Sequence, residues 1–548
     1  MKDGFRQCMA WLHTWSGLIV GWVLFFVFVT GSAGYFQAEI SRWMRPELPI
    51  QNFERFVDQA PVLDVALDRL QEVAPVAASW SITLPHYSLA AREWQGLSIR
   101  WEEMPKDGHE NGASGTEQLD PETGALYTQP EPRATAGGVQ LYRMHYSLHY
   151  MPAELAYRIV GVCTMLMLLA IITGVITHKK IFKDFFTFRP AKGQRSWLDA
   201  HNVVSVLVLP FFLLITYSGL VFFQVDYMPA GVNTLYGSDD QSHEKFFDEY
   251  FDDEHHHVAI GRPPIALAPL LKQAEAQWGP GTVRTVTIEH MQGEEPVVAI
   301  SKVFGGSVKF GDTAQLRFNA QTGEPLPPEH ADSASRQTHD VMLALHEGRF
   351  ADTWTRWLYF VAGLLGCTMI GTGLVLWTVK RRKQHLAAPN TPVWEGFGLR
   401  LVETLNVATL AGLPLGIAAY FWANRLLPIE LSNRPDWELD ALFATWLCTF
   451  FVALLRPLKR AWLELLWTSC GAFALLPVLN FFTTDRHLGV SLAQGDWVMA
   501  GVDLTFWGLA LLFGFIAYKV NRKMAIAQSA AKPAHSEIAL DGAGGSRA

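Results

Sequence analysis

Four histidines stand beside apolar segments in a repeated pattern, and each of these segments carries a Thr-Gly or Ser-Gly pair towards its far end. The histidines are His13, His149, His201 and His346, and the pairs are Thr30-Gly31, Thr173-Gly174, Ser218-Gly219 and Thr372-Gly373. A polar ring at the mouth of a membrane helix is costly unless it binds something. Because two histidines from different helices can hold one iron through its axial positions, the pattern predicts two pairs of axial haem ligands in a four-helix bundle.

The composition indicates a membrane protein with large aqueous parts. The chain is 50% hydrophobic and contains 20 tryptophans, and its mean hydropathy is +0.13. These values are too apolar for a typical soluble protein and too polar for a bundle that lies wholly in the membrane. Eight segments have enough apolar length to cross a bilayer. They lie at about 16–38, 157–177, 203–225, 356–378, 403–423, 440–456, 463–482 and 497–518.

Basic residues set the expected orientation. They gather after the second, fourth, sixth and eighth spans, within 179–195, 380–383, 456–460 and 519–523. Short loops rich in Lys and Arg stay in the cytoplasm. We therefore expect both chain ends in the cytoplasm, with a multi-pass topology in a bacterial inner membrane and two large periplasmic domains.

This orientation divides the chain into ten expected segments. They are a cytoplasmic start with the first span (1–38), a first periplasmic domain (39–150), the second span (151–178), a basic cytoplasmic loop (179–202), the third span (203–225), a second periplasmic domain (226–350), the fourth span (351–380), a cytoplasmic linker (381–402), four extra spans (403–518) and a cytoplasmic tail (519–548).

The same topology predicts how the histidines pair. His13 and His201 begin the helices that leave the cytoplasmic face, and His149 and His346 begin the helices that return from the outer face. We expect one haem between His13 and His201 and another between His149 and His346. The two haems would lie near opposite sides of a hydrocarbon core about 30 Å thick.

Two further histidines compete for these roles. His145 lies four residues before His149, which places it one helical turn away on the same face. His178 ends the second span close to the expected position of His13 and His201. Either residue is an alternative ligand.

The unit of span, outer domain and span occurs twice, at about 1–180 and 196–385. Each outer domain has a helix-like stretch, strand-like runs and a polar turn. The turns are Asp120-Pro121-Glu122-Thr123-Gly124 and Asn319-Ala320-Gln321-Thr322-Gly323. Asp or Asn that opens a turn closed by Gly is typical of hairpins. The repeat predicts two α+β outer domains and pairs the first span with the third and the second with the fourth.

These features resemble the PepSY-associated transmembrane, or iron-regulated membrane protein, family over about 1–385. The motifs that carry the resemblance are Leu12-His13-x-Trp15-x-Gly17, His145-Tyr-Ser-Leu-His149-Tyr-Met, Leu198-Asp199-Ala200-His201, Leu345-His346-x-Gly348-Arg349 and the Asp-Pro-x-Thr-Gly turn. The resemblance implies a multi-pass α-helical membrane protein. A four-helix haem-binding bundle would carry two PepSY-like periplasmic domains, followed by about four extra C-terminal helices.

Some members of this family are inner-membrane ferric-siderophore reductases with two b-type haems. The resemblance therefore implies two haem b, a ferric siderophore as the acceptor of electrons and an unidentified donor on the cytoplasmic side. The sequence shows no nucleophile, catalytic triad or phosphate loop, and nothing in it indicates a nucleic-acid partner. Two other functions compete: a PepSY-type module that binds a ligand or regulates a protease, and a siderophore or iron transporter.

Two further features could bind ions. The stretch Asp252, Asp253, Glu254, His255, His256 and His257 combines carboxylates with imidazoles, which suits a weak iron site or a solvated acidic loop. Glu403 and Asp503 lie at or within the extra spans, where an ionisable residue is a functional candidate for a proton or ion path.

Overall fold

The structure is a computed structural model, and it describes residues 4–531 with short gaps. The gaps are 51–53, 90–91, 105–111, 129–130, 179–180, 182–184, 187–188, 190–192, 240–244, 246–257, 292–294, 305–307, 309–313, 329–333 and 388–392. The chain forms two units. The first contains residues 1–133 and 137–377, and the second contains 134–136 and 378–548.

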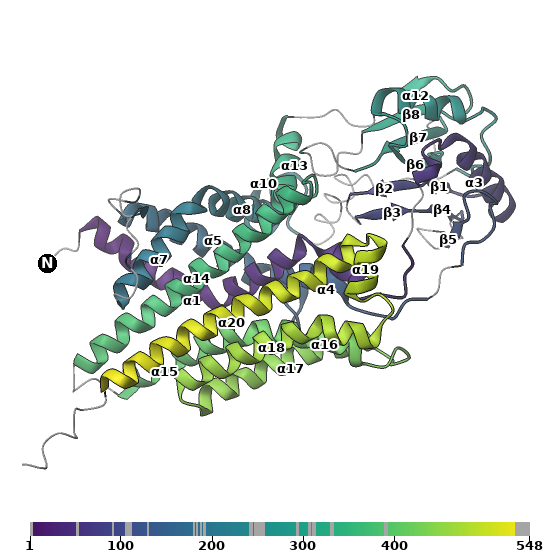
Figure 1. Cartoon of the computed structure of the whole chain (residues 1–548). Helices are drawn as coiled ribbons and strands as arrows, with labels where there is room; N and C mark the ends of the chain where they lie inside the picture. The colour runs from purple at the N-terminus through teal and green to yellow at the C-terminus, as the bar shows by residue number, and fades with distance from the viewer. Residues whose placement is uncertain are drawn as a thin grey trace, which may run out of the picture. The chain divides into compact units, whose positions relative to one another are not determined.

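Seven described helices are long and apolar enough to cross a membrane. The first unit contains α1 (Phe5–Gly34), α5 (Ala153–Thr177) and most of α14 (Thr353–Ala387), which continues into the second unit from Thr378 (Figure 1). Their length and composition agree with three of the spans expected from the sequence, so the chain is a multi-pass membrane protein.

The expected third span is bent. It consists of α7 (Gln194–Leu207) and α8 (Leu209–Phe222), which meet at 68°. Pro210 lies in the first turn of α8. Proline lacks an N–H group and its ring clashes with the preceding turn, and this combination kinks or breaks a helix. The span expected at 203–225 therefore corresponds to this bent pair of helices, which begins at Gln194 and ends at Phe222.

The second unit contains the remaining long helices. α15 (Val393–Val407) continues through a π-helical turn, η2 (Ala408–Gly412), into α16 (Leu413–Leu426). The others are α17 (Arg434–Leu455), α18 (Leu458–Thr483) and α20 (Trp497–Ala531), with the short α19 (Leu488–Gln494) before the last. Four of the apolar spans of the chain lie here.

The strands of the two sequence copies form one antiparallel sheet rather than two. Its order is β5-β4-β1-β6-β7-β8-β9 (Figure 1). The first copy supplies β1 (Ser79–Thr83), β4 (Leu97–Glu102) and β5 (Ser114–Leu119). The second supplies β6 (Val283–Glu289), β7 (Val297–Lys302), β8 (Gln315–Asn319) and β9 (Pro325–Leu326).

The two copies meet at β1 and β6. Trp80 lies opposite Ile288, and Ile82 lies opposite Val286. All four side chains are buried in one core, together with residues of α3 (Ala60–Val73) and α12 (Ala268–Trp278). Alternate residues of a strand face the same side, so this register places the apolar faces of both copies on one core. The two expected outer domains therefore share a sheet.

The polar turns have the expected chemistry. The Asp120 carboxylate accepts the N–H groups of Glu122 and Thr123 at 3.0 and 2.9 Å, and Gly124 has a φ of +69°. In the second copy, Asn319 and Gly323 hold the equivalent positions, with Gly323 at a φ of +78°. Only glycine adopts this backbone conformation without strain.

Shorter elements connect the sheet with the long helices of the first unit. They are α2 (Gln37–Trp43), η1 (Glu54–Phe56), the hairpin β2 (His86–Ser88) and β3 (Glu93–Gln95), α4 (Gly137–Ser147), α9 (Gln224–Tyr227), α10 (Ala230–Leu235) and α13 (Ala334–Glu347). Two of them, α4 and α13, carry histidines near their C-terminal ends.

Candidate functional site: two facing histidine pairs

Four histidines of the first unit form two facing pairs. His13 of α1 and His201 of α7 have ring centroids 6.3 Å apart. His145 of α4 and His346 of α13 have ring centroids 5.9 Å apart. Each pair takes one histidine from each sequence copy, as the duplication predicts.

The Nδ1 atom of each histidine is held by a neighbouring helix. His13 Nδ1 lies 2.8 Å from the carbonyl oxygen of Ala170, and His201 Nδ1 lies 2.9 Å from that of Met369. A carbonyl oxygen can only accept a hydrogen bond, so these Nδ1 atoms carry the proton. The Nε2 atoms then present lone pairs.

The second pair repeats this arrangement. His145 Nδ1 lies 2.8 Å from the carbonyl oxygen of Val27. His346 Nδ1 lies 3.1 Å from the Ser218 hydroxyl and is also hydrogen-bonded to the backbone of Ile215. Because the Ser218 hydroxyl donates its own proton to the Leu214 carbonyl at 2.7 Å, its lone pair is available to accept from His346.

The Thr-Gly and Ser-Gly pairs explain how the rings come so close to these helices. Each histidine contacts the helix at the glycine of one pair. A Cβ atom on Gly31 would lie 2.4 Å from His145 Nδ1, and one on Gly219 would lie 2.9 Å from His346 Cε1. Gly174 and Gly373 stand in the same relation to His13 and His201, at 3.1 and 3.2 Å. Glycine therefore permits the close approach, most tightly at Gly31 and Gly219, where a Cβ atom would stand less than 3.0 Å from the ring.

The hydroxyl groups of the pairs bond within their own helices. Thr30, Thr173, Ser218 and Thr372 each donate to the carbonyl four residues earlier, at distances from 2.7 to 2.9 Å. In this way a polar side chain in an apolar helix is satisfied without a partner from outside. The same turn of each helix also carries the carbonyl group that accepts the hydrogen bond from the histidine Nδ1.

The ring spacing suits a single metal atom between two imidazoles. Metal–imidazole bonds of about 2.0–2.1 Å place the two ring centroids about 6 Å apart. The observed separations are 6.3 and 5.9 Å. A hydrogen bond from Nδ1 to a carbonyl is also the usual way in which a protein orients a histidine that binds metal through its other nitrogen.

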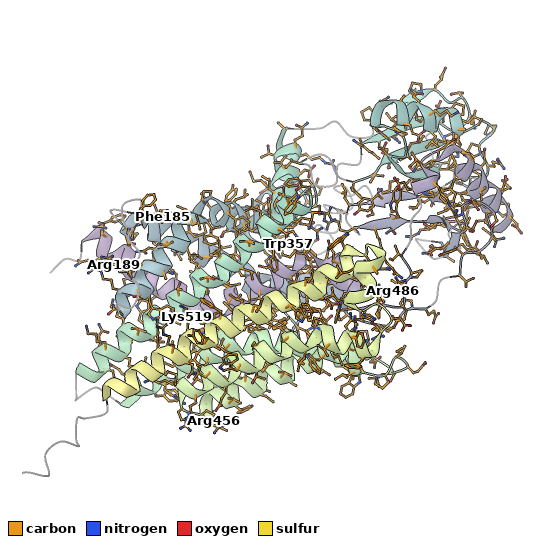
Figure 2. The ribbon with its side chains drawn as sticks, viewed as in Figure 1. Phe185, Arg189, Trp357, Arg456, Arg486 and Lys519 are labelled. Carbon is orange, nitrogen blue, oxygen red and sulfur yellow. The ribbon has the colours of Figure 1, made fainter. Side chains whose placement is uncertain are left out.

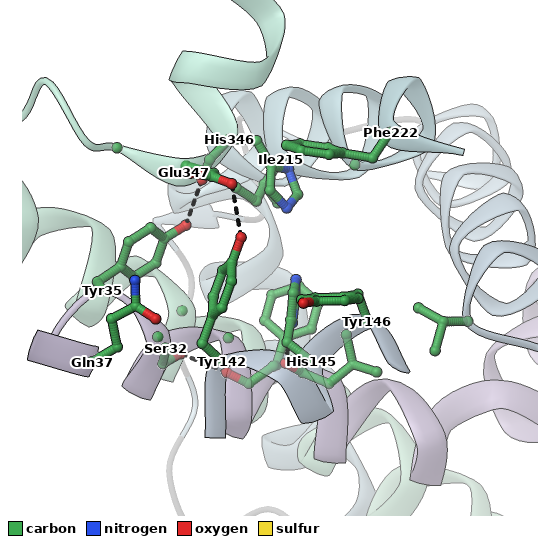
Figure 3. Close-up of a pocket in the computed structure, with 18 of the residues that line it drawn as sticks. Ser32, Tyr35, Gln37, Tyr142, His145, Tyr146, Ile215, Phe222, His346 and Glu347 are labelled. Carbon is green, nitrogen blue, oxygen red and sulfur yellow. Dashed lines mark hydrogen bonds between the residues drawn. The ribbon is translucent and has the colours of Figure 1, made fainter. Parts of the chain in front are cut away.

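A cavity of about 530 Å³ adjoins the His145–His346 pair (Figure 3). Figure 3 shows these two side chains pointing toward one another, with Phe222 and Tyr146 beside them. Most of the lining is apolar and comes from α1, α5 and α8, which supply Val27, Val160 and Ile215 among others.

Polar groups line the rest of this cavity. Tyr142 donates to the Glu347 carboxylate at 2.7 Å, and Arg349 forms an ion pair with the same carboxylate. Arg356 is only 4% exposed and contacts Glu39 at 2.6 Å. The cavity thus combines an apolar body with the buried Arg356, the more exposed Arg349 and two carboxylates. A mostly apolar pocket with a few placed polar groups is typical of ligand sites.

Burial keeps the second histidine pair neutral. Desolvation lowers the pKa of His346 to about 3, and the neighbouring His145 adds to this shift. Desolvation also lowers the pKa of His145, against an opposing effect of its hydrogen bond to Val27. Neutral imidazole is the form that binds metals.

We expected His149 to lie opposite His346, but the structure does not place it there. α4 ends at Ser147, and the His149 ring lies against Tyr150 at a centroid distance of 4.2 Å. His145 occupies the expected position instead. The pairing is therefore corrected to His145 with His346, which was the alternative.

His178 is also separate from the pairs. It caps the C-terminus of α5, and its Nε2 lies 2.9 Å from Asn202 Nδ2. His201 faces His13, so the structure selects His201 over His178 for this pair.

The other candidate ion sites have different outcomes. The stretch from Asp252 to His257 lies outside the described residues. Among the residues that are described, no group of three or more His, Cys, Asp or Glu side chains could hold a metal ion. Glu403 forms an ion pair with Arg382, and Asp503 is fully buried and accepts from Asn480 at 3.1 Å.

The polar lining of the cavity was not predicted from the sequence. Arg349 stood in a quoted motif, but Tyr142, Glu39 and Arg356 carried no signal that distinguishes them from interfacial residues. The spacing of Tyr142 and His145, one helical turn apart, was the available indication that both face the same site.

The fold and the site together describe a class of multi-pass membrane protein in which a duplicated unit brings two pairs of histidines face to face. The family model described as "PepSY-associated TM region" matches residues 10–380, and the chain belongs to this family. An uncharacterized protein of Pseudomonas aeruginosa is 25% identical over 426 residues, which cover 73% of this chain and 98% of the relative.

Proposed function

We propose that the chain is a haem protein of a bacterial inner membrane that carries electrons to a ferric siderophore on the periplasmic face. The observation that supports this most strongly is the fourfold repeat of one arrangement. Each histidine is held through Nδ1 by a helix with a Thr-Gly or Ser-Gly pair. Each also faces a second histidine, and the distance between the two ring centroids is about that of two imidazoles bound to one metal atom.

The donor set favours haem over a bare ion. A protein site for a free transition metal usually needs three or four ligands. Each pair here offers two, which is the number that a porphyrin leaves for the protein at its axial positions. His13 with His201 would hold one haem b, and His145 with His346 would hold the other.

The cavity beside His145 and His346 also fits such a group. Its apolar walls suit a macrocycle, and its cations, Arg92, Arg349 and Arg356, suit carboxylate substituents. When bound, haem supplies a one-electron change between Fe(III) and Fe(II). The protein residues orient the axial nitrogens, exclude water and set the local charge.

The two sites lie at different levels of one helix. On α1, His13 belongs to the first pair and Val27 holds His145 of the second. At a rise of 1.5 Å per residue, these levels are separated by about 21 Å along the helix. This separation covers much of a hydrocarbon core about 30 Å thick. The arrangement therefore supports transfer across the membrane between two fixed sites.

The positions of basic residues support the proposed orientation of the two histidine pairs in the membrane. Lys and Arg gather in the stretches 179–195 and 380–383, on the expected cytoplasmic side. His13 and His201 would then receive electrons from a cytoplasmic donor. His145 and His346 would deliver them to the periplasmic acceptor.

The substrate class follows from the chemistry of iron. Ferric ion is a hard cation that siderophores hold through oxygen ligands. Each bound Fe(III) that takes up one electron becomes Fe(II), which these hard ligands hold less tightly. The protein supplies the electron and docks the complex, and the metal then leaves its chelator.

Stopped-flow reoxidation tests this function. The purified protein would be reduced anaerobically and mixed with a ferric hydroxamate siderophore and a colorimetric Fe(II) chelator. The proposal predicts reoxidation of the haem bands together with formation of the Fe(II) chelate. A reduced protein that remains reduced with ferric hydroxamates and catecholates, although ferricyanide oxidises it, would contradict the siderophore assignment.

A further inference from the structure

The helices of the second unit contain a group of charged and amide side chains that solvent does not reach. Its members are Asn424, Arg425, Arg434, Glu438, Asn480 and Asp503, each 5% exposed or less. Most of this unit lies beyond the family match, which ends at residue 380. Buried ions are costly and need full compensation, so the contacts of this group are informative.

Glu438 of α17 is at the centre of the group. Its Oε1 accepts from Arg434 at 2.5 Å and from Asn424 at 2.7 Å. Its Oε2 accepts from the Thr135 hydroxyl at 2.6 Å and from the Ala136 N–H at 3.0 Å. Four hydrogen bonds on one carboxylate compensate for its removal from water.

Arg434 also binds the short segment formed by residues 134–136. Its guanidinium donates to the Ala134 carbonyl at 2.8 Å and to the backbone carbonyl of Asn424. Ala134, Thr135 and Ala136 are thus each bonded to a buried ionic pair of α17. These three residues belong to the second unit, although the chain on either side of them belongs to the first.

Further contacts extend the group to α18 and α20. Arg425 donates to Asn480 at 2.9 Å and also to the side chain of Asn424. Asn480 in turn donates to Asp503 at 3.1 Å. The network therefore ties α16, α17, α18 and α20 together behind the carboxylate that holds residues 134–136.

The held segment leads directly into a ligand helix. Gly137 follows Ala136 and is the first residue of α4, which carries His145. Gly137 has a φ of +65°, which allows the chain to turn there, and the Gly138 N–H donates to Ser41 at 2.9 Å. Fixing Ala136 therefore constrains the residue that immediately precedes α4, the helix on which His145 lies.

We infer that the C-terminal helices are a positioning device for His145, and that Glu438 and Arg434 act by clamping residues 134–136. This gives a role to the part of the chain outside the family match. The positioning itself is a property of the polypeptide. Only its consequence for a haem depends on the proposed function.

Hydrogen exchange of the full-length protein in detergent provides the direct test, with Thr135→Val and Glu438→Gln as variants. Thr135→Val removes one hydroxyl with little change of shape, and Thr135→Ser restores it. The matched control is Glu464→Gln, which removes a carboxylate from an exposed ion pair in the same unit. Its partner Arg456 is labelled in Figure 2. We expect amide exchange in residues 137–147 to rise about tenfold in Thr135→Val and Glu438→Gln. Exchange in residues 334–347 should not change, and Thr135→Ser and Glu464→Gln should behave as wild type.

A second readout separates this inference from the proposed function. In a redox titration followed by absorption, the haem held by His145 and His346 should change its potential in Glu438→Gln, whereas the haem held by His13 and His201 should keep its own. A wild-type protein without haem contradicts the proposed function, but the exchange experiment still decides the positioning. Unchanged exchange in residues 137–147 of both Thr135→Val and Glu438→Gln overturns the inference.

Discussion

The imidazole of His145 lies directly against the backbone of Gly31, so that a Cβ atom on this glycine would stand 2.4 Å from His145 Nδ1. Close approach here also brings His145 within 2.8 Å of the Val27 carbonyl that orients it. The glycine and the carbonyl together determine where the ring nitrogen on the far side points. A glycine faces each of the four histidines, and the contact is tightest at Gly31, where a single added methyl group would overlap the ring.

Gly31→Ala should displace His145 and disturb one site only. Overpacking of a tight contact costs about 1–3 kcal/mol, and here the ring has to move away from its carbonyl. We expect a loss of haem from the His145–His346 site, measured as the haem content per chain. Gly17→Ala on the same helix is the control, because a Cβ atom there meets nothing within 4 Å. Equal haem content in the two variants would argue against the role of the glycine.

Removal of single histidines should distinguish ligands from neighbours. His145→Ala and His346→Ala should each retain about one haem per chain instead of about two, because a bis-histidine site needs both rings. His149→Ala should retain both, since its ring lies against Tyr150. A pyridine haemochrome assay gives the counts. Loss of haem in His149→Ala with none in His145→Ala would reverse the assignment.

The buried Arg356 should raise the potential of the adjacent haem. Arg356→Gln leaves the Glu39 carboxylate buried without its cation, and negative charge stabilises the ferric state. We expect this potential to fall by about 40–90 mV, which corresponds to about 1–2 kcal/mol for one electron. Arg55→Gln removes a guanidinium from an exposed pair and should leave the potential unchanged. Spectroelectrochemical titration compares the two, and an unshifted or raised potential in Arg356→Gln would contradict this electrostatic role.

Because the two copies share one sheet, a substitution that destabilises one copy should also destabilise the other. Ile288 of β6 lies opposite Trp80 of β1 in the common core. Ile288→Ala should cost about 2–5 kcal/mol and should speed amide exchange in β4 as well as in β7. Val76→Ala is the control, because Val76 is 65% exposed. Faster exchange confined to β6, β7 and β8 would mean that the copies are independent.

The positions of helices and strands along the chain were easier to predict than the way in which these elements pair with one another. Strand-like runs at Val283–Ile288 and Val297–Ile300 and both polar turns were predicted, because periodicity and turn chemistry are local. The structure has strands at Val283–Glu289 and Val297–Lys302. The pairing of Trp80 with Ile288 joins residues far apart in the chain, and no local pattern encodes it. Pro210 was visible in the sequence as the cause of the bent span, but high apolarity concealed the break.

The sites show the same division. The duplication placed His13 and His201 on helices that the structure brings together. The sequence placed His149 at the start of a returning helix and left His145 as the alternative ligand, and in the structure α4 ends at Ser147, before His149. The carbonyl groups of Ala170, Val27 and Met369 could not be predicted, because every residue has such a group and only packing selects one.

The most direct measurement is the visible absorption spectrum of the detergent-purified protein from haem-replete cells, oxidised and then reduced, with a haem count. The two facing histidine pairs predict sharp low-spin bands and about two haem b per chain. A colourless protein, or one whose haem is high-spin and removed by washing, would contradict electron transfer through these histidines.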